Sequence, residues 1–294
     1  MKIIFATDGS EYAEGAAEFL KNFKFSINDE IIILYVISIV PFKDDRASYY
    51  ASLQNIKQQI APKILDSAVN KLKDINAKIS TALLDGYPDK LIIDAAVNTD
   101  ADLIIIGARG LKGLKSLFLG SVTRSVAAKS PKSILVIKPS TKNIKEGLKI
   151  LYATDGSDYA IKAAEFLTKI PFPENTEVTI LNVIPTSYID VPERYWLEVN
   201  DRVKQEVAMI REKEFEVSNR IIKDAKNILD KKFKKIDFSL KFGDPSEEIL
   251  LASKELNTDI IAVGSSGIRG IKGMLGSVSR NIIMHSECSV LISK

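Results

Sequence analysis

The chain has 294 residues, of which 46% are hydrophobic and 27% are charged, and its formal net charge is +3. This length suggests two domains of ordinary globular composition, and the weak positive charge gives no indication of nucleic-acid binding. One cysteine, Cys288, excludes an internal disulfide, and one histidine, His285, excludes a multi-histidine metal site.

The N-terminal segment reaches Asp8 after only a few apolar residues, which is too short for a secretory leader. The longest nearly apolar stretch, residues 31–42, is too short to span a bilayer. We therefore expect a cytoplasmic protein that has neither a membrane nor a nucleic acid as its partner.

Short apolar runs alternate with helical stretches along the first half of the chain. The runs are rich in Ile and Val without strict alternation, which indicates strands buried on both faces. We expect strands at 2–7, 31–38, 79–84, 102–107 and 133–138. The spacing of apolar residues predicts helices at 11–23, 61–72, 89–98 and 121–128. Five strands with intervening helices predict an α/β fold with a doubly wound parallel sheet.

The second half of the chain repeats the first. Residues 3–20 and 150–167 are identical at 13 of 18 positions, and the polar stretch 138–149 contains the Pro and Gly of a linker. We expect two whole domains in tandem, at 1–140 and 147–294. The second copy has about ten extra residues between its second and third strands, within the charged and mostly helical segment 190–235. That segment is either a solvated face or a cover for the second site.

Glycines gather after the fourth strand of each copy. Nine of the 15 glycines fall in the segments 107–120 and 264–276. Glycines let a backbone approach a ligand closely, and a helix N-terminus adds unpaired N–H donors and partial positive charge. The pattern therefore predicts a phosphate site, in which Ser121 caps the helix or binds a phosphate oxygen and Arg109, Lys112 and Lys115 add charge. A tight loop with no ligand is the alternative.

The loop after the first strand reads Ala6-Thr7-Asp8-Gly9-Ser10 and recurs as Ala153-Thr154-Asp155-Gly156-Ser157. We predict an Asp-Gly turn in which Ser10 caps the next helix. In the functional interpretation, Asp8 also accepts hydrogen bonds from ribose hydroxyls or an adenine amine, and the backbone of Val36 meets the adenine edge.

Two other phosphate-binding motifs do not fit. The segment that starts at Gly110 and ends in Lys115-Ser116 lacks the glycine that a P-loop has before its Lys-Ser pair, and it follows the fourth strand. The first strand is not followed by G-x-G-x-x-G, so a dinucleotide fingerprint is absent.

With its spacing of two and nine residues between Gly107, Gly110, Gly120 and Ser121, the chain resembles the ATP-binding branch of the universal stress protein family. The Asp after the first strand and the Val at the end of the second strand match that family too. The resemblance implies two Rossmann-like domains with strand order 3-2-1-4-5. It also implies dimer-like pairing through the last strands, here between the two halves of one chain, while a homodimer of whole chains stays open.

The resemblance also implies a site in each copy for ATP with Mg²⁺ and no protein metal ligand. In the first copy the binding residues would be Ala6, Asp8, Val36, Gly107, Arg109, Gly110, Gly120, Ser121 and Val122. In the second copy they would be Ala153, Asp155, Val183, Gly264, Gly267, Gly276, Ser277 and Val278. Only eight residues separate Gly267 from Gly276, so we expect the second site to be weaker or empty.

Three functions remain open from the sequence. The first is a nucleotide-dependent regulatory protein of the stress response that acts on unidentified protein partners. The second is an interaction module of the same fold that binds no nucleotide. The third is a slow ATPase, although the sequence offers no general base or activated nucleophile near the glycine loop. We assign His285 no catalytic role and expect Cys288 to begin the last strand as a packing residue.

Overall fold

A computed structural model describes residues 1–39, 47–110, 119–138, 147–185, 200–268 and 274–294. The elements of the first half are β1 (Lys2–Thr7), α1 (Glu11–Leu20), β2 (Glu30–Ser38), α2 (Ala47–Leu72), β3 (Lys78–Gly86), α3 (Pro88–Asn98), β4 (Leu103–Gly107), α4 (Ser121–Lys129) and β5 (Ser133–Ile137). Those of the second half are β6 (Lys149–Ala153), α5 (Asp158–Lys169), β7 (Glu177–Ile184), α7 (Asp201–Leu229), β8 (Lys235–Phe242), α8 (Pro245–Glu255), β9 (Ile260–Gly264), α9 (Ser277–His285) and β10 (Ser289–Ser293).

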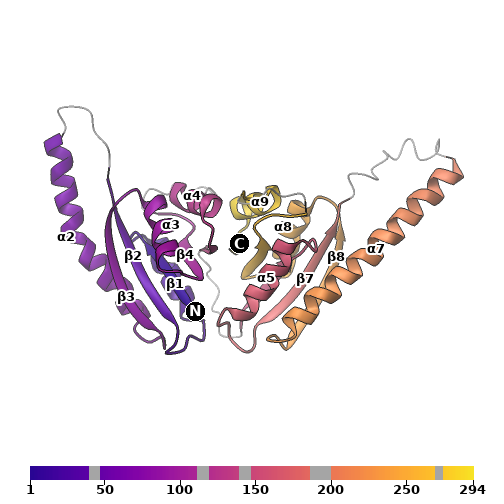
Figure 1. The fold of residues 1–294 in the computed structure, drawn as a ribbon, viewed down its shortest axis with the longest axis horizontal. Coiled ribbons are helices and arrows are strands. Elements are labelled where there is room, and N and C mark those ends of the chain that lie inside the picture. Colours follow the sequence, from indigo (N-terminus) through magenta and orange to yellow (C-terminus); the bar gives the residue numbers. More distant parts are fainter. Residues whose placement is uncertain (40–46, 111–118, 139–146, 186–199, 269–273) are drawn as a thin grey trace.

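Within the described residues, ten strands form one sheet in the order β3-β2-β1-β4-β5-β10-β9-β6-β7-β8. This confirms the predicted order in both halves and the predicted pairing through the last strands. Strands are parallel within each half, and the halves join where β5 runs antiparallel to β10. Figure 1 shows the halves side by side with α2 and α7 on the two outer sides.

Helices cover both faces of the sheet because successive strand residues point to opposite faces. In β1, Ile3 belongs to a buried cluster that includes residues of α1 and α2, such as Leu20 and Leu65. Its neighbour Ile4 belongs to a second buried cluster that includes Ile92 of α3 and Val126 of α4. The strands therefore read as continuous apolar runs, as the sequence indicated.

The first cluster is continuous across the two halves. Phe23 follows α1, and its ring lies 5.2 Å from the ring of Phe172 in the second half in an edge-to-face arrangement. The backbone N–H of Lys24 donates to the carbonyl of Pro171 over 2.6 Å. The halves are thus joined by a shared core as well as by one strand pair.

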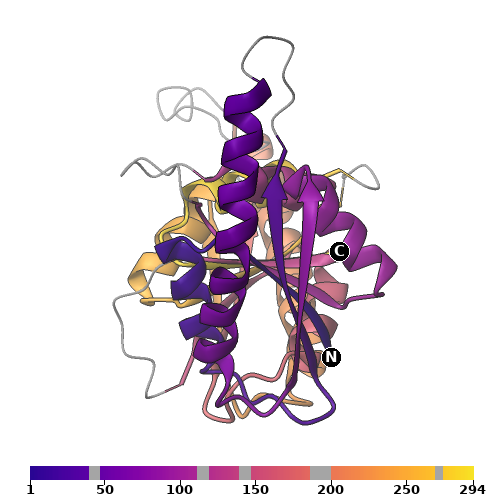
Figure 2. The same ribbon diagram turned by 90° about the vertical axis from the view of Figure 1, so that its left-hand side faces the viewer.

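The predicted helices were right in kind and less accurate in length. The first ends at Leu20 rather than at 23, because residues 21–23 form a turn. The stretch predicted at 61–72 is the end of α2, a helix of 26 residues. Figure 2 shows its amino-terminal turns rising past the ends of the strands. The last strand begins at Ser289, one residue later than predicted from Cys288.

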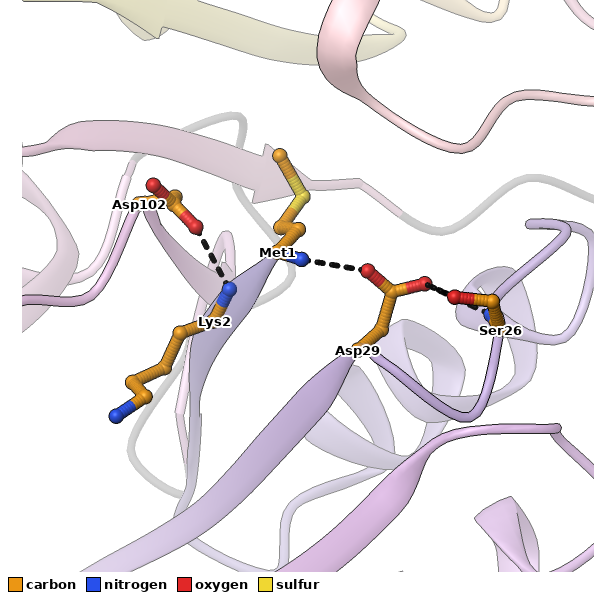
Figure 3. A network of polar contacts seen from close by, with 5 residues as sticks. All are labelled: Met1, Lys2, Ser26, Asp29 and Asp102. Carbon is orange, nitrogen blue, oxygen red and sulfur yellow. Dashed lines mark hydrogen bonds and ion pairs between the residues drawn. The ribbon is translucent and has the colours of Figure 1, made fainter.

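Polar contacts fasten the amino-terminal edge of the first half (Figure 3). The ammonium group of Met1 donates to Asp29 over 2.6 Å, and Ser26 donates to the same carboxylate through its N–H and its hydroxyl. Burial alone would raise the pKa of Asp29, but these bonds outweigh burial and hold the pKa below its ordinary value. The backbone N–H of Lys2 donates to Asp102 over 2.7 Å. The loops of the predicted site lie at the opposite, carboxyl end of β1.

None of the helices in the described ranges combines the length and the apolarity that a membrane-spanning segment requires.

Candidate functional site

The turn after β1 has the conformation that its Asp-Gly sequence predicts. Gly9 adopts a φ of +75°, and the N–H of Ser10 donates to Asp8 Oδ1 over 3.1 Å. The hydroxyl of Ser10 accepts from the N–H of Ala13 over 3.3 Å and caps α1, as expected. The second half repeats each feature through Gly156, Asp155, Ser157 and Ala160. This turn leaves each aspartate half-buried at the strand tip.

Two glycines of the first loop have a packing reason to be glycine. A Cβ on Gly107 would lie 3.1 Å from the carbonyl group of Tyr12, so β4 ends against the first turn of α1. A Cβ on Gly110 would lie 2.2 Å from Asp8 Oδ2, so a side chain there would displace the carboxylate. The structure thus brings Gly110 and Asp8 together, as the binding hypothesis requires, but these two glycines serve the fold as well.

Gly120 has no packing reason to be glycine. Its φ of −61° and ψ of 149° suit any residue, and an added Cβ would come no nearer than 3.4 Å to Ala108 or Arg109, an ordinary contact. Gly120 is the N-cap of α4 and supplies no side-chain hydrogen bond to the helix. A polar side chain is the usual occupant of this position, since it would satisfy the orphan amides. Glycine instead gives the start of α4 no side-chain cap.

Two expectations for this loop need correction. Ser121 does not cap α4, because the helix begins at Ser121 itself and its exposed side chain lies within the first turn. The amides of 107–122 are not all open to a ligand either. The N–H of Gly120 donates to the carbonyl of Ala108 over 2.9 Å, and that of Ala108 donates to Ile137 at the end of β5 over 2.8 Å. The available donors are therefore the first-turn amides from Ser121 onward, which have no intrahelical acceptor.

A buried hydroxyl that we did not predict anchors this helix. Thr123 Oγ1 donates to the carbonyl of Gly107 over 2.8 Å, and Ser279 Oγ does the same to Gly264 over 2.7 Å in the second half. Each hydroxyl is the third residue of its helix and ties the helix start to the end of the preceding strand. The sequence signal was a hydroxyl residue two positions after the Gly-Ser pair in both copies.

Arg109 is held beside the loop by α1. Its Nη1 donates to the hydroxyl of Tyr12 over 2.9 Å, and its guanidinium lies 5.4 Å from the centre of that ring. The Cα of Arg109 lies 3.4 Å from where a Cβ on Gly120 would be, so its backbone adjoins the start of α4 while its charge is held at α1. Lys112 and Lys115, which we also expected to add charge, lie outside the described residues.

The predicted adenine side of the site is apolar. Ala6 and Val36 are 5% and 8% exposed and belong to the buried cluster beneath α3 and α4. Next to Val36, burial raises the pKa of Tyr35, and the negative charge of Asp8 raises it further. Because the side chain of Val36 is buried, the binding hypothesis leaves only its backbone to meet a base.

The second half has the same kind of loop and helix start as the first, with different side chains around them. Gly276, at a φ of −63°, is an N-cap without a side-chain hydrogen bond, and Ser277 and Val278 open the helix. Ser266 stands where the first half has Arg109. It is 6% exposed, and its hydroxyl has no hydrogen-bond partner among the described residues. Asp155 Oδ2 lies 2.6 Å from where a Cβ on Gly267 would be.

The carboxylate of Asp155 is engaged by its own loop. Its Oδ2 accepts from the N–H of Ile268 over 3.1 Å, and its Oδ1 accepts from Ser157 over 3.0 Å. Beside it, Ala153 is buried and Val183 half-buried, in the same cluster as α8 and α9. A ribose hydroxyl bound at Asp155 would therefore share the carboxylate with the loop.

The described part of the longer insertion is α7, which packs against the Asp-Gly turn of the second half. A Cβ on Gly156 would meet Ile221 of α7 at 2.8 Å, just as one on Gly9 would meet Ile64 of α2 at 3.0 Å. Helix α7 therefore takes the place of α2, on the face opposite α9. Most of its side chains are exposed, which agrees with a solvated charged face.

Among the described side chains, no group of three acidic, histidine or cysteine residues is placed to hold a metal ion.

The chain matches known proteins along nearly its full length. The model of the universal stress protein family matches residues 1–138 and again 148–294. A universal stress protein of Methanocaldococcus jannaschii is 33% identical over 152 residues, which is 47% of this chain and 94% of that protein. The protein YxiE of Bacillus subtilis, of the same description, is 34% identical over 154 residues, which is 49% of this chain and 97% of that protein.

One solved structure matches both halves at once. It is a universal stress protein of Archaeoglobus fulgidus, with a TM-score of 0.64, 24% identity, and coverage of 100% of this chain and 96% of that one. At this identity the likeness supports the tandem fold alone.

Proposed function

Because the chain belongs to the universal stress protein family, as two of its domains in tandem, we propose that it binds an adenine nucleotide at the glycine loop of the first half. The nucleotide in this proposal is ATP with Mg²⁺. The proposed domains are 1–140 and 147–294, and the proposed location is the cytoplasm.

Gly120 is the observation that carries the proposal. Its backbone conformation and surroundings accept a side chain, yet glycine leaves the first turn of α4 without a side-chain cap, next to the backbone of Arg109. A helix N-terminus that presents amides and partial positive charge is a site for phosphate. Asp8, Gly110 and Gly120 thus come from three places in the sequence to one edge of the sheet.

Each predicted residue has a role in this proposal. The amides of Ser121 and Val122 and the hydroxyl of Ser121 bind phosphate oxygens, with Arg109 adding charge. Asp8 accepts from the ribose, and Ala6 and the backbone of Val36 border the adenine. Gly107 and Gly110 let β4 and the loop approach α1 and Asp8 closely. Mg²⁺ would neutralise phosphate charge, with phosphate and water oxygens as its ligands.

We propose that the second site is weaker. Ser266 offers no cation where the first half has Arg109. The loop is also one residue shorter. Tight binding would therefore be close to one nucleotide per chain.

The biological role in this proposal is regulation of protein partners by nucleotide occupancy. The interaction module without nucleotide is the second candidate, and the packing reasons for Gly107 and Gly110 favour it. A slow ATPase is the third. ATP turnover well above background in the wild type, lost in Asp8→Ala, would support the ATPase.

Titration calorimetry with Mg-ATP, Mg-ADP and AMP tests the proposal. We expect wild-type binding to weaken more than tenfold in Gly120→Ala because a Cβ covers the amides, at an unchanged melting temperature. Gly15→Ala is the matched control: Gly15 lies in α1 with nothing within 4 Å of an added Cβ, so this variant should bind normally. No binding by the wild type, or equal binding by Gly120→Ala, would leave the interaction module as the better account.

A further inference from the structure

Reciprocal contacts join the two halves at the β5·β10 pair. The N–H of Lys138, just after β5, donates to the hydroxyl of Ser289 at the start of β10 over 3.2 Å. The N–H of Lys294, just after β10, donates to the hydroxyl of Ser133 at the start of β5 over 3.3 Å. Each of the two strands, β5 and β10, is therefore extended at its carboxyl end by a hydrogen bond to the first residue of the other strand.

The side chains of the two lysines also cross the joint. Lys294 Nζ donates to the carbonyl of Ala127 in α4 over 3.2 Å. Lys138 Nζ donates to the carbonyl of Ile283 in α9 over 3.2 Å, to the hydroxyl of Ser286 over 3.0 Å, and to the carbonyl of Ser286. Each half thus supplies a cation to the carboxyl end of a helix in the other half.

The two helices that receive these lysines are α4 and α9, the helices with uncapped N-termini at the glycine loops. Each has nine residues and spans about 13 Å, so a charge at either end interacts with the same few peptide dipoles. An anion at the amino end and a cation at the carboxyl end both stabilise such a helix. The lysine also fixes where the helix ends, while Thr123 or Ser279 fixes where it begins.

We propose that Lys294 and Lys138 are positioning residues that act across the joint, so that the phosphate helix of each half depends on a lysine of the other half. This inference rests on the proposed nucleotide site. In its terms the first site is incomplete without the second half of the chain. In this proposal the tandem arrangement contributes directly to nucleotide binding.

Burial of both lysines works against the charged form that this role uses, although Lys138 is still mostly protonated at pH 7. Burial lowers the pKa of each, that of Lys138 to about 8. Cys288 and Glu287 raise the pKa of Lys138, while the positive charge of Arg109 lowers it. Since Arg109 lies in the first glycine loop, the joint and that loop share an electrostatic environment.

Lys294→Met in the full chain tests the inference, with the Mg-ATP affinity of the first site as the readout. We expect a loss of about three- to tenfold, and recovery in Lys294→Arg, whose guanidinium keeps the charge and the donor. Lys129→Met is the matched control: Lys129 lies in the last turn of α4 but is exposed and paired only with Asp89 at 3.6 Å. Its removal should change affinity less than twofold.

The outcomes separate the two proposals. No binding by the wild type overturns the proposed function and this inference with it. Normal binding by a folded Lys294→Met, or equal losses in Lys294→Met and Lys129→Met, overturns the inference alone. If Lys294→Met does not fold, Lys294→Gln keeps a donor without the charge, and an affinity equal to that of the wild type would overturn the inference.

Discussion

The two halves share a framework and differ around one feature, the uncapped start of the helix after the glycine loop. Both have an Asp-Gly turn, an N-cap glycine and a hydroxyl that ties the helix to the strand. The first half has Arg109 in its glycine loop, with the guanidinium held by Tyr12, whereas the second half has a buried Ser266 at the same position. The comparison teaches that the fold and the N-cap glycine can recur within one chain while the loop length and the side chain before the second loop glycine, Arg109 or Ser266, do not.

The largest effect should come from a glycine that lies against the backbone of a neighbouring helix. A Cβ on Gly264 would lie 2.7 Å from the backbone of Tyr159, against 3.1 Å for Gly107 and Tyr12. We expect Gly264→Ala to lower the free energy of unfolding by about 3 kcal/mol and Gly107→Ala by about 1 kcal/mol, since overpacking against backbone is costly. Urea denaturation measures both. The reverse order would contradict the close approach in the second half.

The next largest effect should come from making the first half resemble the second. In Arg109→Ser, we expect the affinity for Mg-ATP to fall about tenfold because a charge-assisted contact to phosphate is lost. Calorimetry on Tyr12→Phe, which removes only the hydroxyl that Arg109 binds, distinguishes the effect of the charge from the effect of holding it in place. An unchanged affinity in Arg109→Ser would mean that this residue does not account for the difference between the halves.

A smaller effect is expected from the orphaned hydroxyl of the second half. Ser266→Ala removes a buried polar atom without a partner, so the free energy of unfolding should rise by up to about 1 kcal/mol. Ser279→Ala is the matched control, because it breaks the bond to Gly264 and should destabilise. A loss of stability in Ser266→Ala would show that this hydroxyl has a partner in solution.

The smallest effect is a dependence on pH at the joint. The pKa of Lys138 is about 8 in the folded chain and near 10.5 when unfolded, so the unfolded state binds more protons and stability should rise with pH above 8. Cys288 opposes this from about pH 9, because burial raises its thiol pKa from 9.0 to about 11. Between pH 8 and 9 the wild type should therefore gain stability relative to Lys138→Met.

This prediction also distinguishes the halves. Arg109 contributes to the low pKa of Lys138, and Ser266 takes its place near the other loop. Arg109→Ser should therefore move the pKa of Lys138 toward its ordinary value, which titration followed by NMR can measure. A pKa that does not move would contradict the electrostatic contact between the loop and the joint.

Much of the fold was readable from the sequence because its signals are local or repeated. The duplicated segments predicted two domains, the apolar runs predicted the strands, and Ser10 was a correct cap because its hydroxyl precedes a helical pattern. The cap of α4 was misassigned, since Ser121 has the favoured chemistry but Gly120 has the cap conformation. Only the geometry shows that the glycine there is not required by packing.

The contacts at the joint could not be predicted from the sequence. Lys294 and Lys138 bind backbone carbonyls, which leave no pattern of side chains to match, and their partners are more than 140 positions away. The contact between Arg109 and Tyr12 likewise spans 97 positions. Such contacts follow from strand order and from the antiparallel meeting of β5 and β10.

The most direct test of the account is the amount of adenine nucleotide released when the purified protein is denatured by heat, measured by chromatography. The account predicts about one nucleotide per chain from the wild type and from Gly276→Ala, and almost none from Gly120→Ala. Wild-type protein that releases no nucleotide and does not take up added Mg-ATP would contradict it, as would release that depends on Gly276 and not on Gly120.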